Sequence, residues 1–251
     1  MAAITPIDRS ELDFDNGTFD AAGFTAQTLS SWQSLAAVID HTLLKPEATR
    51  EQVENLCDET VRYHFACAMV NPIWAATAVN LLSGTGIPVG VVIGFPFGAS
   101  LVSTLRQEAS TLIRHGVREI DMVIPIGKLK SGDHQAVHHA VHSAASEVHH
   151  HGALLKVILE TALLTVEEKL RASEIAIQAG ADFLKTSTGF AGGGATAADV
   201  ALLRGVAGAR CGVKASGGIR SLADVRTMLE SGANRIGASA SVSIVRELGA
   251  E

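Results

Sequence analysis

Three lysines stand at even spacing in the second half of the chain. Lys156, Lys185 and Lys214 follow one another at intervals of 29 residues, about the length of a strand, a crossover helix and the return to the next parallel strand. Each lies in or at the end of a short apolar run, and lysine is rarely buried without a reason. The spacing predicts three neighbouring parallel strands that direct their amines toward one site.

Neighbouring amines inside a protein favour imine chemistry. An amine attacks a carbonyl only when neutral, whereas an unperturbed lysine has a pKa of about 10.4. Burial and a second ammonium can lower that pKa to about 7 to 8. Asp121, set in the apolar segment EIDMV, could pass protons through water to and from a substrate hydroxyl and a carbinolamine. The imine would be the electron sink for breaking a carbon–carbon bond, a reaction that needs no metal or other cofactor.

The alternative is that these lysines and Asp121 form interior ion pairs that fill the barrel and have no catalytic role. Such pairs occur in barrels, and a single lysine would favour this interpretation. Three lysines, one aspartate and adjacent glycine-rich loops favour catalysis instead.

The loops after the last three expected strands are suited to an anion. Their glycines, which let backbone amides approach a ligand closely, are Gly189, Gly217, Gly218 and Gly237. Helices expected to begin near Ser221 and Ser239 would point their positive ends inward, and Arg220 adds a cation. Barrels commonly hold phosphate at this position. In the alternative interpretation, the glycines serve only tight turns.

Composition favours one domain that acts on small molecules. The chain has 251 residues, of which 47% are hydrophobic and 18% charged, enough for the large core of a single α/β barrel. A net charge of -6 without a basic run argues against a nucleic-acid partner or an acidic membrane surface.

No signal peptide and no apolar stretch long enough to span a bilayer are expected. Scattered cysteines, with Cys67 and Cys211 in apolar runs, indicate core residues in a reducing compartment such as the cytoplasm.

Eight short apolar segments alternate with helical patterns. We expect strands at residues 38–42, 65–70, 89–94 and 119–124, three more around the lysines, and an eighth at 235–238. This order predicts a single TIM (β/α)8 barrel over residues 31–251, after a polar N-terminal extension of residues 1–30 and a short helix that begins after Ser30 and Ser31. An open doubly wound sheet is the alternative, but no Gly-x-Gly-x-x-Gly turn follows the first strand. Pro46 and the acidic residues after it predict the start of the first barrel helix.

In a barrel, polar residues at the carboxyl ends of the strands gather in one mouth. Those expected there, besides the glycine loops, are Asp40, Asn71, Asp121, Lys156, Lys185 and Lys214. We base the functional hypothesis on this convergence.

The helix expected from about residue 133 to 151 is rich in histidine. It carries His134, His138, His139, His142, His149, His150 and His151. Pairs such as His138 and His142 have the helical spacing of four that can bind a metal, but no cysteine or acidic residue completes a set. We expect a solvated helix face and assign it no function.

Five ordered motifs extend from the first expected strand to the seventh. They are DHTLLKP at 40–46, EIDMV at 119–123, LKVILET at 155–161, FLKTSTG at 183–189 and VKASGGIR at 213–220. Together they resemble the motifs of the deoxyribose-phosphate aldolase family, over residues 38–245. The resemblance implies a cofactor-independent class I aldolase, a homodimer, that interconverts 2-deoxy-D-ribose 5-phosphate with glyceraldehyde 3-phosphate and acetaldehyde in deoxyribose phosphate breakdown.

The resemblance also implies roles for individual residues. Lys185 would be the Schiff-base lysine, Lys214 the neighbour that lowers its pKa, and Asp121 the proton-relay acid, while Lys156 and Asp40 complete the network. The residues expected around the substrate and its phosphate are Thr42, Thr186, Gly189, Gly217, Gly218, Arg220, Gly237 and Ser239.

The chain departs from the family pattern at two places. Some members have a lysine directly after Thr-Ser-Thr-Gly, where this chain has Phe190, which leaves Arg220 as the clearest cation for a phosphate. Some members end in a tyrosine thought to assist proton transfer, whereas the single tyrosine here is Tyr63. Water held by Asp121 and Lys214 would then have to carry that proton.

Three other functions stay open on the sequence. A related Schiff-base aldolase for a larger sugar phosphate would share the lysines, although small residues near Lys185 favour a two-carbon donor. A barrel that binds sugar phosphates without catalysis would keep the polar network idle. Metal-dependent aldol chemistry is disfavoured because the mouth motifs contain no histidine cluster.

Overall fold

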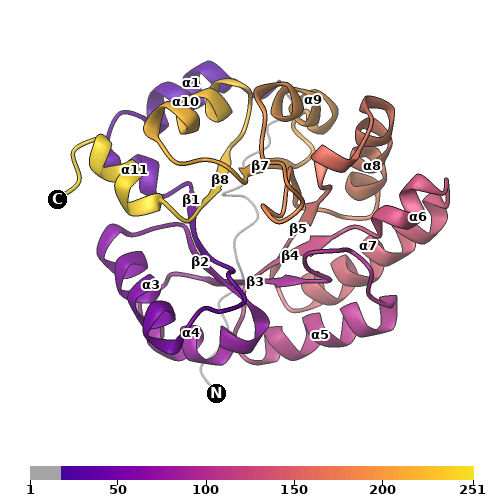
Figure 1. The fold of residues 1–251 in the computed structure, drawn as a ribbon, viewed down its shortest axis with the longest axis horizontal. Coiled ribbons are helices and arrows are strands. Elements are labelled where there is room, and N and C mark those ends of the chain that lie inside the picture. The colour runs from indigo at the N-terminus through magenta and orange to yellow at the C-terminus, as the bar shows by residue number, and fades with distance from the viewer. Residues whose placement is uncertain (1–17) are drawn as a thin grey trace.

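The computed structural model describes residues 18–251, so residues 1–17 of the predicted N-terminal extension lie outside the described residues. Eight parallel strands close into a barrel in chain order, and the helices form a ring around it (Figure 1). Pairing of the first strand with the eighth closes the sheet, which rules out the open doubly wound alternative. The predicted TIM barrel is confirmed.

The strands lie close to the expected segments. They are β1 Ile39–Leu43, β2 Cys67–Val70, β3 Val89–Ile93, β4 Glu119–Val123, β5 Leu154–Ile158, β6 Phe183–Lys185, β7 Gly212–Ser216 and β8 Arg235–Ala238. The helices before β4 are α1 Ala21–Thr28, α2 Trp32–Ala36, α3 Arg50–Tyr63, α4 Ala75–Leu81 and α5 Val102–Arg114. The later helices are α6 Ile126–Lys130, α7 His134–His150, α8 Val166–Gln178, α9 Ala197–Ala207, α10 Leu222–Glu230 and α11 Ser241–Glu247. The loops also contain the short 3-10 helices η2 Pro72–Trp74 and η3 Thr161–Leu163.

Hydroxyl side chains fix where several helices begin. Capping boxes stand at the start of α3, α8 and α10, and in each of them the hydroxyl of the cap residue accepts an amide of the first turn. The cap residues are Thr49, Thr165 and Ser221. These caps set the exit of each loop at the carboxyl end of the barrel.

Helix α3 begins later than expected. Pro46 was predicted to open it, but the Ala48 amide donates to the Lys45 carbonyl at 3.1 Å, so the proline lies in a turn. The helix starts after Thr49, whose amide donates to Gln52 Oε1 at 3.0 Å and whose hydroxyl accepts the Gln52 amide. The capping box thus determines the start of the helix.

The described part of the N-terminal extension is helical. Helix α1 is capped by Asp20 and packs against α10 on the outside of the barrel (Figure 1). The short helix expected after Ser30 and Ser31 is α2, and the Ser31 hydroxyl accepts the Ser34 amide at its start. This part of the extension therefore joins the helical layer.

The interior of the barrel has an apolar side and a charged side. Beside β2 and β3, Cys67, Met69 and Val92 form a small buried cluster with Leu44. A Cβ at Gly90 would come within 2.5 Å of the Met69 methyl, so this glycine makes room for the methionine. Strands on the other side direct charged side chains inward. All three cysteines are buried and free, as core residues would be.

Within residues 18–251, no helix has both the length and the apolar character needed to cross a bilayer.

Candidate active site

Asp121 lies at the centre of the three lysines. Lys156 Nζ donates to Asp121 Oδ1 at 2.9 Å, while Lys185 Nζ and Lys214 Nζ each donate to Oδ2 at 2.7 Å. All four side chains are buried. The geometry therefore agrees with the expectation that three strands bring their amines to one place.

The register of the sheet explains this convergence. Asp121 on β4 is the partner of Lys156 on β5, and Lys185 on β6 is the partner of Lys214 on β7. The β6 partner of Lys156 is Phe183, two residues before Lys185. Lys156 thus lies nearer the amino ends of the strands, below the other two amines.

A second carboxylate and an arginine extend the network to the amino end of the barrel. Asp40 contacts Lys214 closely, accepts from Arg235 Nε at 2.6 Å and lies 3.6 Å from Lys156 Nζ. Arg235 also donates to Glu119 Oε1 at 2.7 Å, and Glu119 forms a close ion pair with Lys156. We call the seven residues the interior charged cluster: Asp40, Glu119, Asp121, Lys156, Lys185, Lys214 and Arg235.

Glu119 and Arg235 were not among the predicted site residues. A signal for them existed, because side chains on one face of a strand recur every second residue. Glu119 stands two residues before Asp121, and Arg235 stands two residues before Gly237. Both therefore share a face with a residue that was singled out.

The cluster gives its lysines different acidities. Burial, with a contribution from the Lys214 ammonium, lowers the pKa of Lys185 to about 8 against the opposing effect of Asp121. Burial would also lower the pKa of Lys156, but Asp121, Glu119 and Asp40 outweigh it and raise that pKa well above its ordinary value. Lys185 is therefore the amine that more readily becomes neutral.

The carboxylates of the cluster are held in the ionised form. Burial would raise the pKa of Asp121, but the three lysines outweigh it and keep that pKa well below the ordinary value. Burial acts in the same direction on Asp40, but Arg235, Lys214 and Lys156 together lower its pKa. Asp121 and Asp40 can thus accept protons or hydrogen bonds at neutral pH.

Lys185 lines a cavity at the carboxyl ends of the strands. The cavity has a volume of about 410 Å³ and is bounded by the loops after β1, β6, β7 and β8. Among the described residues, Lys185 is the member of the interior charged cluster that lines it. A substrate carbonyl in this cavity can therefore reach Lys185 Nζ, whereas Lys156 Nζ lies beneath it.

Seven of the eight residues predicted to bind substrate or phosphate line the same cavity: Thr42, Gly189, Gly217, Gly218, Arg220, Gly237 and Ser239. Thr186 does not line it. Its hydroxyl is buried, accepts from the Ser216 amide and donates to the Ser216 carbonyl. Because Lys185 points into the barrel, the next residue along the chain points the other way.

Asn71, which was also expected in the mouth, has a structural role at its edge. Its side-chain amide donates to the Leu44 carbonyl at 3.0 Å. The side chain ties the end of β2 to the loop after β1, and it belongs neither to the cavity lining nor to the interior charged cluster.

The helix α10 offers fewer amides to an anion than expected. The amides of Arg220 and Ser221 donate to Asp224, the Asp224 amide donates to Ser221, and the Leu222 amide donates to Glu247. These bonds use most of the donors at the start of the helix. The glycine loops and the Arg220 side chain are left as the better anion-binding groups.

Three of the loop glycines are required by the backbone. Gly189, Gly217 and Gly218 have φ values of 84°, 87° and 80°, which residues with a Cβ rarely adopt. Gly237 has a different role, because a Cβ there would meet the Lys214 side chain and Ser216 at 3.0 Å. Gly237 thus leaves the space through which Lys214 reaches Asp40.

The cavity contains further side chains to which the sequence motifs gave no role. Lys45, which is exposed, lines the cavity and adds a second cation beside Arg220. Phe190 also lines it, and its ring lies edge-on to Phe95 with centroids 5.3 Å apart. The cavity lining therefore combines exposed cations with an aromatic ring.

Beneath this mouth, Glu160 is fully buried and accepts from the Thr188 amide at 3.2 Å. The Glu160 carboxylate also forms a close hydrogen bond with the Thr188 hydroxyl. It thus holds the start of the glycine-rich loop that follows β6.

The single tyrosine lies at the end of α3. Tyr63 Oη donates to the Glu251 carbonyl at 3.1 Å and accepts from Arg246 at 3.0 Å. A helix after a barrel strand runs back toward the amino ends of the strands, so Tyr63 lies at the opposite end from the cavity. Tyr63 does not line the cavity that Lys185 faces.

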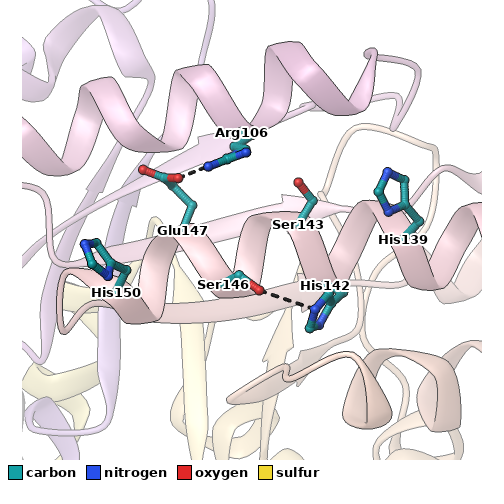
Figure 2. Close-up of a pocket in the computed structure, with 7 residues that line it drawn as sticks. All are labelled: Arg106, His139, His142, Ser143, Ser146, Glu147 and His150. Carbon is teal, nitrogen blue, oxygen red and sulfur yellow. Dashed lines mark hydrogen bonds and ion pairs between the residues drawn. The ribbon is translucent and has the colours of Figure 1, made fainter.

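The histidine-rich helix α7 lies outside the barrel. Figure 2 shows a surface pocket lined by His139, His142 and His150 from α7, with Arg106 from α5 bonded to Glu147 at 3.1 Å. These three histidines are exposed. Within residues 18–251, the α7 histidines supply no convergent group of three metal ligands. This part of the helix face is solvated, as expected from the sequence.

Comparison with known proteins places this barrel in a family. A family model described as DeoC/LacD family aldolase matches residues 34–248. The chain belongs to the DeoC/LacD aldolase family. It is 50% identical over 216 residues to the deoxyribose-phosphate aldolase of Lysinibacillus sphaericus, a match that covers 86% of this chain and 96% of that one. It is 51% identical over 214 residues to the deoxyribose-phosphate aldolase of Halalkalibacterium halodurans, covering 85% and 95%.

A solved structure in the family agrees with the fold. The tetrameric deoxyribose phosphate aldolase from Aeropyrum pernix superposes with a TM-score of 0.84 at 34% identity, over 91% of this chain and 96% of that one. The protein is an aldolase of this family, and the match spans the strands that carry the interior charged cluster.

Proposed function

We propose that this aldolase interconverts 2-deoxy-D-ribose 5-phosphate with D-glyceraldehyde 3-phosphate and acetaldehyde through a Schiff base on Lys185. The observation that carries the proposal is the position of Lys185, whose amine lines the cavity and donates to Asp121 at 2.7 Å. The pKa of about 8 leaves part of this amine neutral near pH 7. The names of relatives that share half of its residues support the substrate.

In cleavage, neutral Lys185 attacks the aldehyde carbon of the open-chain sugar, and the carbinolamine loses water to give an iminium ion. Removal of the proton from the 3-hydroxyl then breaks the bond between C2 and C3, releasing glyceraldehyde 3-phosphate and leaving an enamine. Protonation at C2 and hydrolysis release acetaldehyde and the free amine. We assign the proton transfers to water held by Asp121 and Lys214, because Asp121 Oδ2 accepts from both the Lys185 and the Lys214 amines.

The phosphate would lie against the glycine loops at the far side of the cavity. Gly189, Gly217 and Gly218 present backbone there, and Arg220 and Lys45 supply positive charge. Because Phe190 brings no charge, these two cations carry more of the electrostatic attraction than they would beside a lysine at that position.

We also propose a homodimer in the cytoplasm. The side chains of Ile73, Phe97 and Leu101 are 81%, 78% and 74% exposed, and they lie on segments after β2 and β3. Exposed large apolar residues are typical of surfaces that a second subunit covers. The free, buried cysteines fit a reducing compartment. Light scattering of the purified protein tests the assembly, and a monomeric mass would contradict it.

The decisive experiment for the reaction is trapping. The protein is incubated with acetaldehyde and sodium borohydride, digested and mapped by mass spectrometry, and we expect an ethyl adduct on the peptide that contains Lys185. Cleavage of 2-deoxyribose 5-phosphate is measured in parallel, with and without a chelator. Absence of the adduct while phosphate still binds would indicate a barrel that binds sugar phosphates without catalysis. An adduct on Lys156 or Lys214 would mean that this lysine, and not Lys185, forms the Schiff base.

A further inference from the structure

The interior charged cluster contains more basic than acidic groups. Within residues 18–251, it brings together four basic side chains, Lys156, Lys185, Lys214 and Arg235, and three acidic ones, Asp40, Glu119 and Asp121. Six of these side chains are buried, and Arg235 is 14% exposed at the amino end of the barrel. If every group were ionised, the cluster would carry one uncompensated positive charge in a medium where such a charge is unfavourable.

Loss of one lysine proton removes this excess. Arg235 cannot release a proton in the accessible pH range. Lys156 contacts three carboxylates and Lys214 contacts two, whereas Lys185 contacts only Asp121, through an oxygen that it shares with Lys214. The least compensated ammonium is therefore Lys185, the one that faces the cavity.

The groups that determine this balance extend well beyond the cavity. Glu119 and Arg235 are bonded to each other at 2.7 Å, and neither lines the cavity. Arg235 contacts Asp40, which contacts Lys214, which in turn donates to Asp121. Glu119 contacts Lys156, which also donates to Asp121. Both routes end at the carboxylate that holds Lys185.

We propose that Glu119 and Arg235 are positioning residues that set the protonation of Lys185 by fixing the net charge of the cluster. This inference rests on the proposed Schiff-base role of Lys185. It assigns a function to a pair that does not touch substrate, and it predicts opposite effects for the two members.

Other titratable groups near the cluster do not change the count. Burial raises the pKa of Cys67, on β2, well above its ordinary value, so this thiol is neutral. Glu160, after β5, is bonded to Thr188 rather than to a lysine. Lys45 and Arg220 are exposed at the mouth. The surrounding solvent screens their charges from the interior charged cluster.

The test compares charge variants by the pH dependence of trapping. Glu119→Gln increases the positive excess, so half-maximal ethyl adduct formation on Lys185 should move to lower pH, by about one unit. Arg235→Gln removes the excess and should move it to higher pH by a similar amount. The double variant restores the original net charge and should return the midpoint toward that of the unaltered protein.

Two controls separate charge from structure. Arg235→Lys keeps the charge and should keep the midpoint even if stability falls. Arg204→Gln removes a partly buried arginine of α9, which donates to the Gly232 carbonyl outside the cluster, and should leave the midpoint unchanged. Circular dichroism and thermal melting establish which variants fold. If Arg235→Gln does not fold, the single variants Glu119→Gln and Arg235→Lys are compared, and only Glu119→Gln should shift the midpoint.

The outcomes are distinct. Single variants that fold but shift in the same direction, or do not shift, would overturn the inference, as would a double variant that shifts further than either. If the unaltered protein forms no adduct on Lys185, the proposed function fails instead.

Discussion

Lysine occurs both at the mouth of the barrel and at its floor, the part of the interior charged cluster toward the amino ends of the strands, with its pKa shifted in opposite directions. At the mouth, Lys185 contacts one carboxylate oxygen, and its pKa falls to about 8. At the floor, Lys156 is just as deeply buried but has three carboxylates around it, and its pKa rises. Burial alone therefore does not create a reactive amine in this protein. For these two buried lysines, the number of carboxylates in contact determines whether the pKa falls or rises.

The sharpest test of the mouth is Lys185→Met. Loss of the amine should reduce cleavage of 2-deoxyribose 5-phosphate by at least about 10⁴-fold, because no covalent intermediate can form. The melting temperature should stay the same or rise, since a poorly compensated buried charge is removed. Steady-state assays and calorimetry measure both, and retained turnover would show that another lysine is the nucleophile.

The matched change at the floor is Lys156→Met. It leaves Glu119, Asp40 and Asp121 with fewer cations, so we expect a loss of about 3–5 kcal/mol in the free energy of unfolding. Urea denaturation followed by circular dichroism gives this value. Equal stability of the Lys156→Met and Lys185→Met proteins would remove the distinction between floor and mouth.

Lys214→Met changes the acidity at the mouth while leaving the nucleophile in place. Removing this neighbouring ammonium should raise the pKa of Lys185 above about 8, so the neutral fraction at pH 7 falls. We expect a rate loss of at least about tenfold at pH 7, and the part caused by the higher pKa shrinks as the pH is raised through that pKa, while any part caused by loss of the water that Lys214 holds remains. A pH–rate profile records it, and a profile parallel to that of the unaltered protein would contradict the role.

The smallest effects should come from the exposed cations at the mouth. Arg220→Gln and Lys45→Gln should each raise KM for the phosphorylated sugar by about threefold to tenfold, because exposed charges are partly screened. Neither should alter KM for 2-deoxyribose itself. Equal losses on both sugars, measured in steady-state assays, would mean that these residues shape the cavity and do not bind phosphate.

The barrel and its mouth were more predictable from the sequence than the floor. Apolar runs and the even lysine spacing were enough to predict the strands, and the strand motifs were enough to predict that Lys185, Lys214 and Asp121 lie close together. Glu119 and Arg235 were missed because they pair across 116 positions of the chain. Such a contact follows from barrel closure and register, neither of which local patterns specify.

Other differences have local physical causes. Thr186 could have been excluded, because strand alternation directs it away from the face of Lys185. The start of α10 looked suitable for an anion, yet its own capping box and Glu247 use the amides. Lys45 was part of a motif, but only the folded loop brings it beside the cavity.

The ion pair between Asp40 and Arg235 joins the first strand to the last. A nascent chain or a fragment that lacks β8 would hold Asp40 and Lys214 without their arginine, and one that lacks β1 would leave Arg235 and Lys214 without Asp40. The electrostatic balance of the reactive amine is therefore reached only when the ring is complete. Assembly of the interior charged cluster and completion of folding therefore become one event, so a partly folded chain should not show the acidity that Lys185 has in the closed barrel.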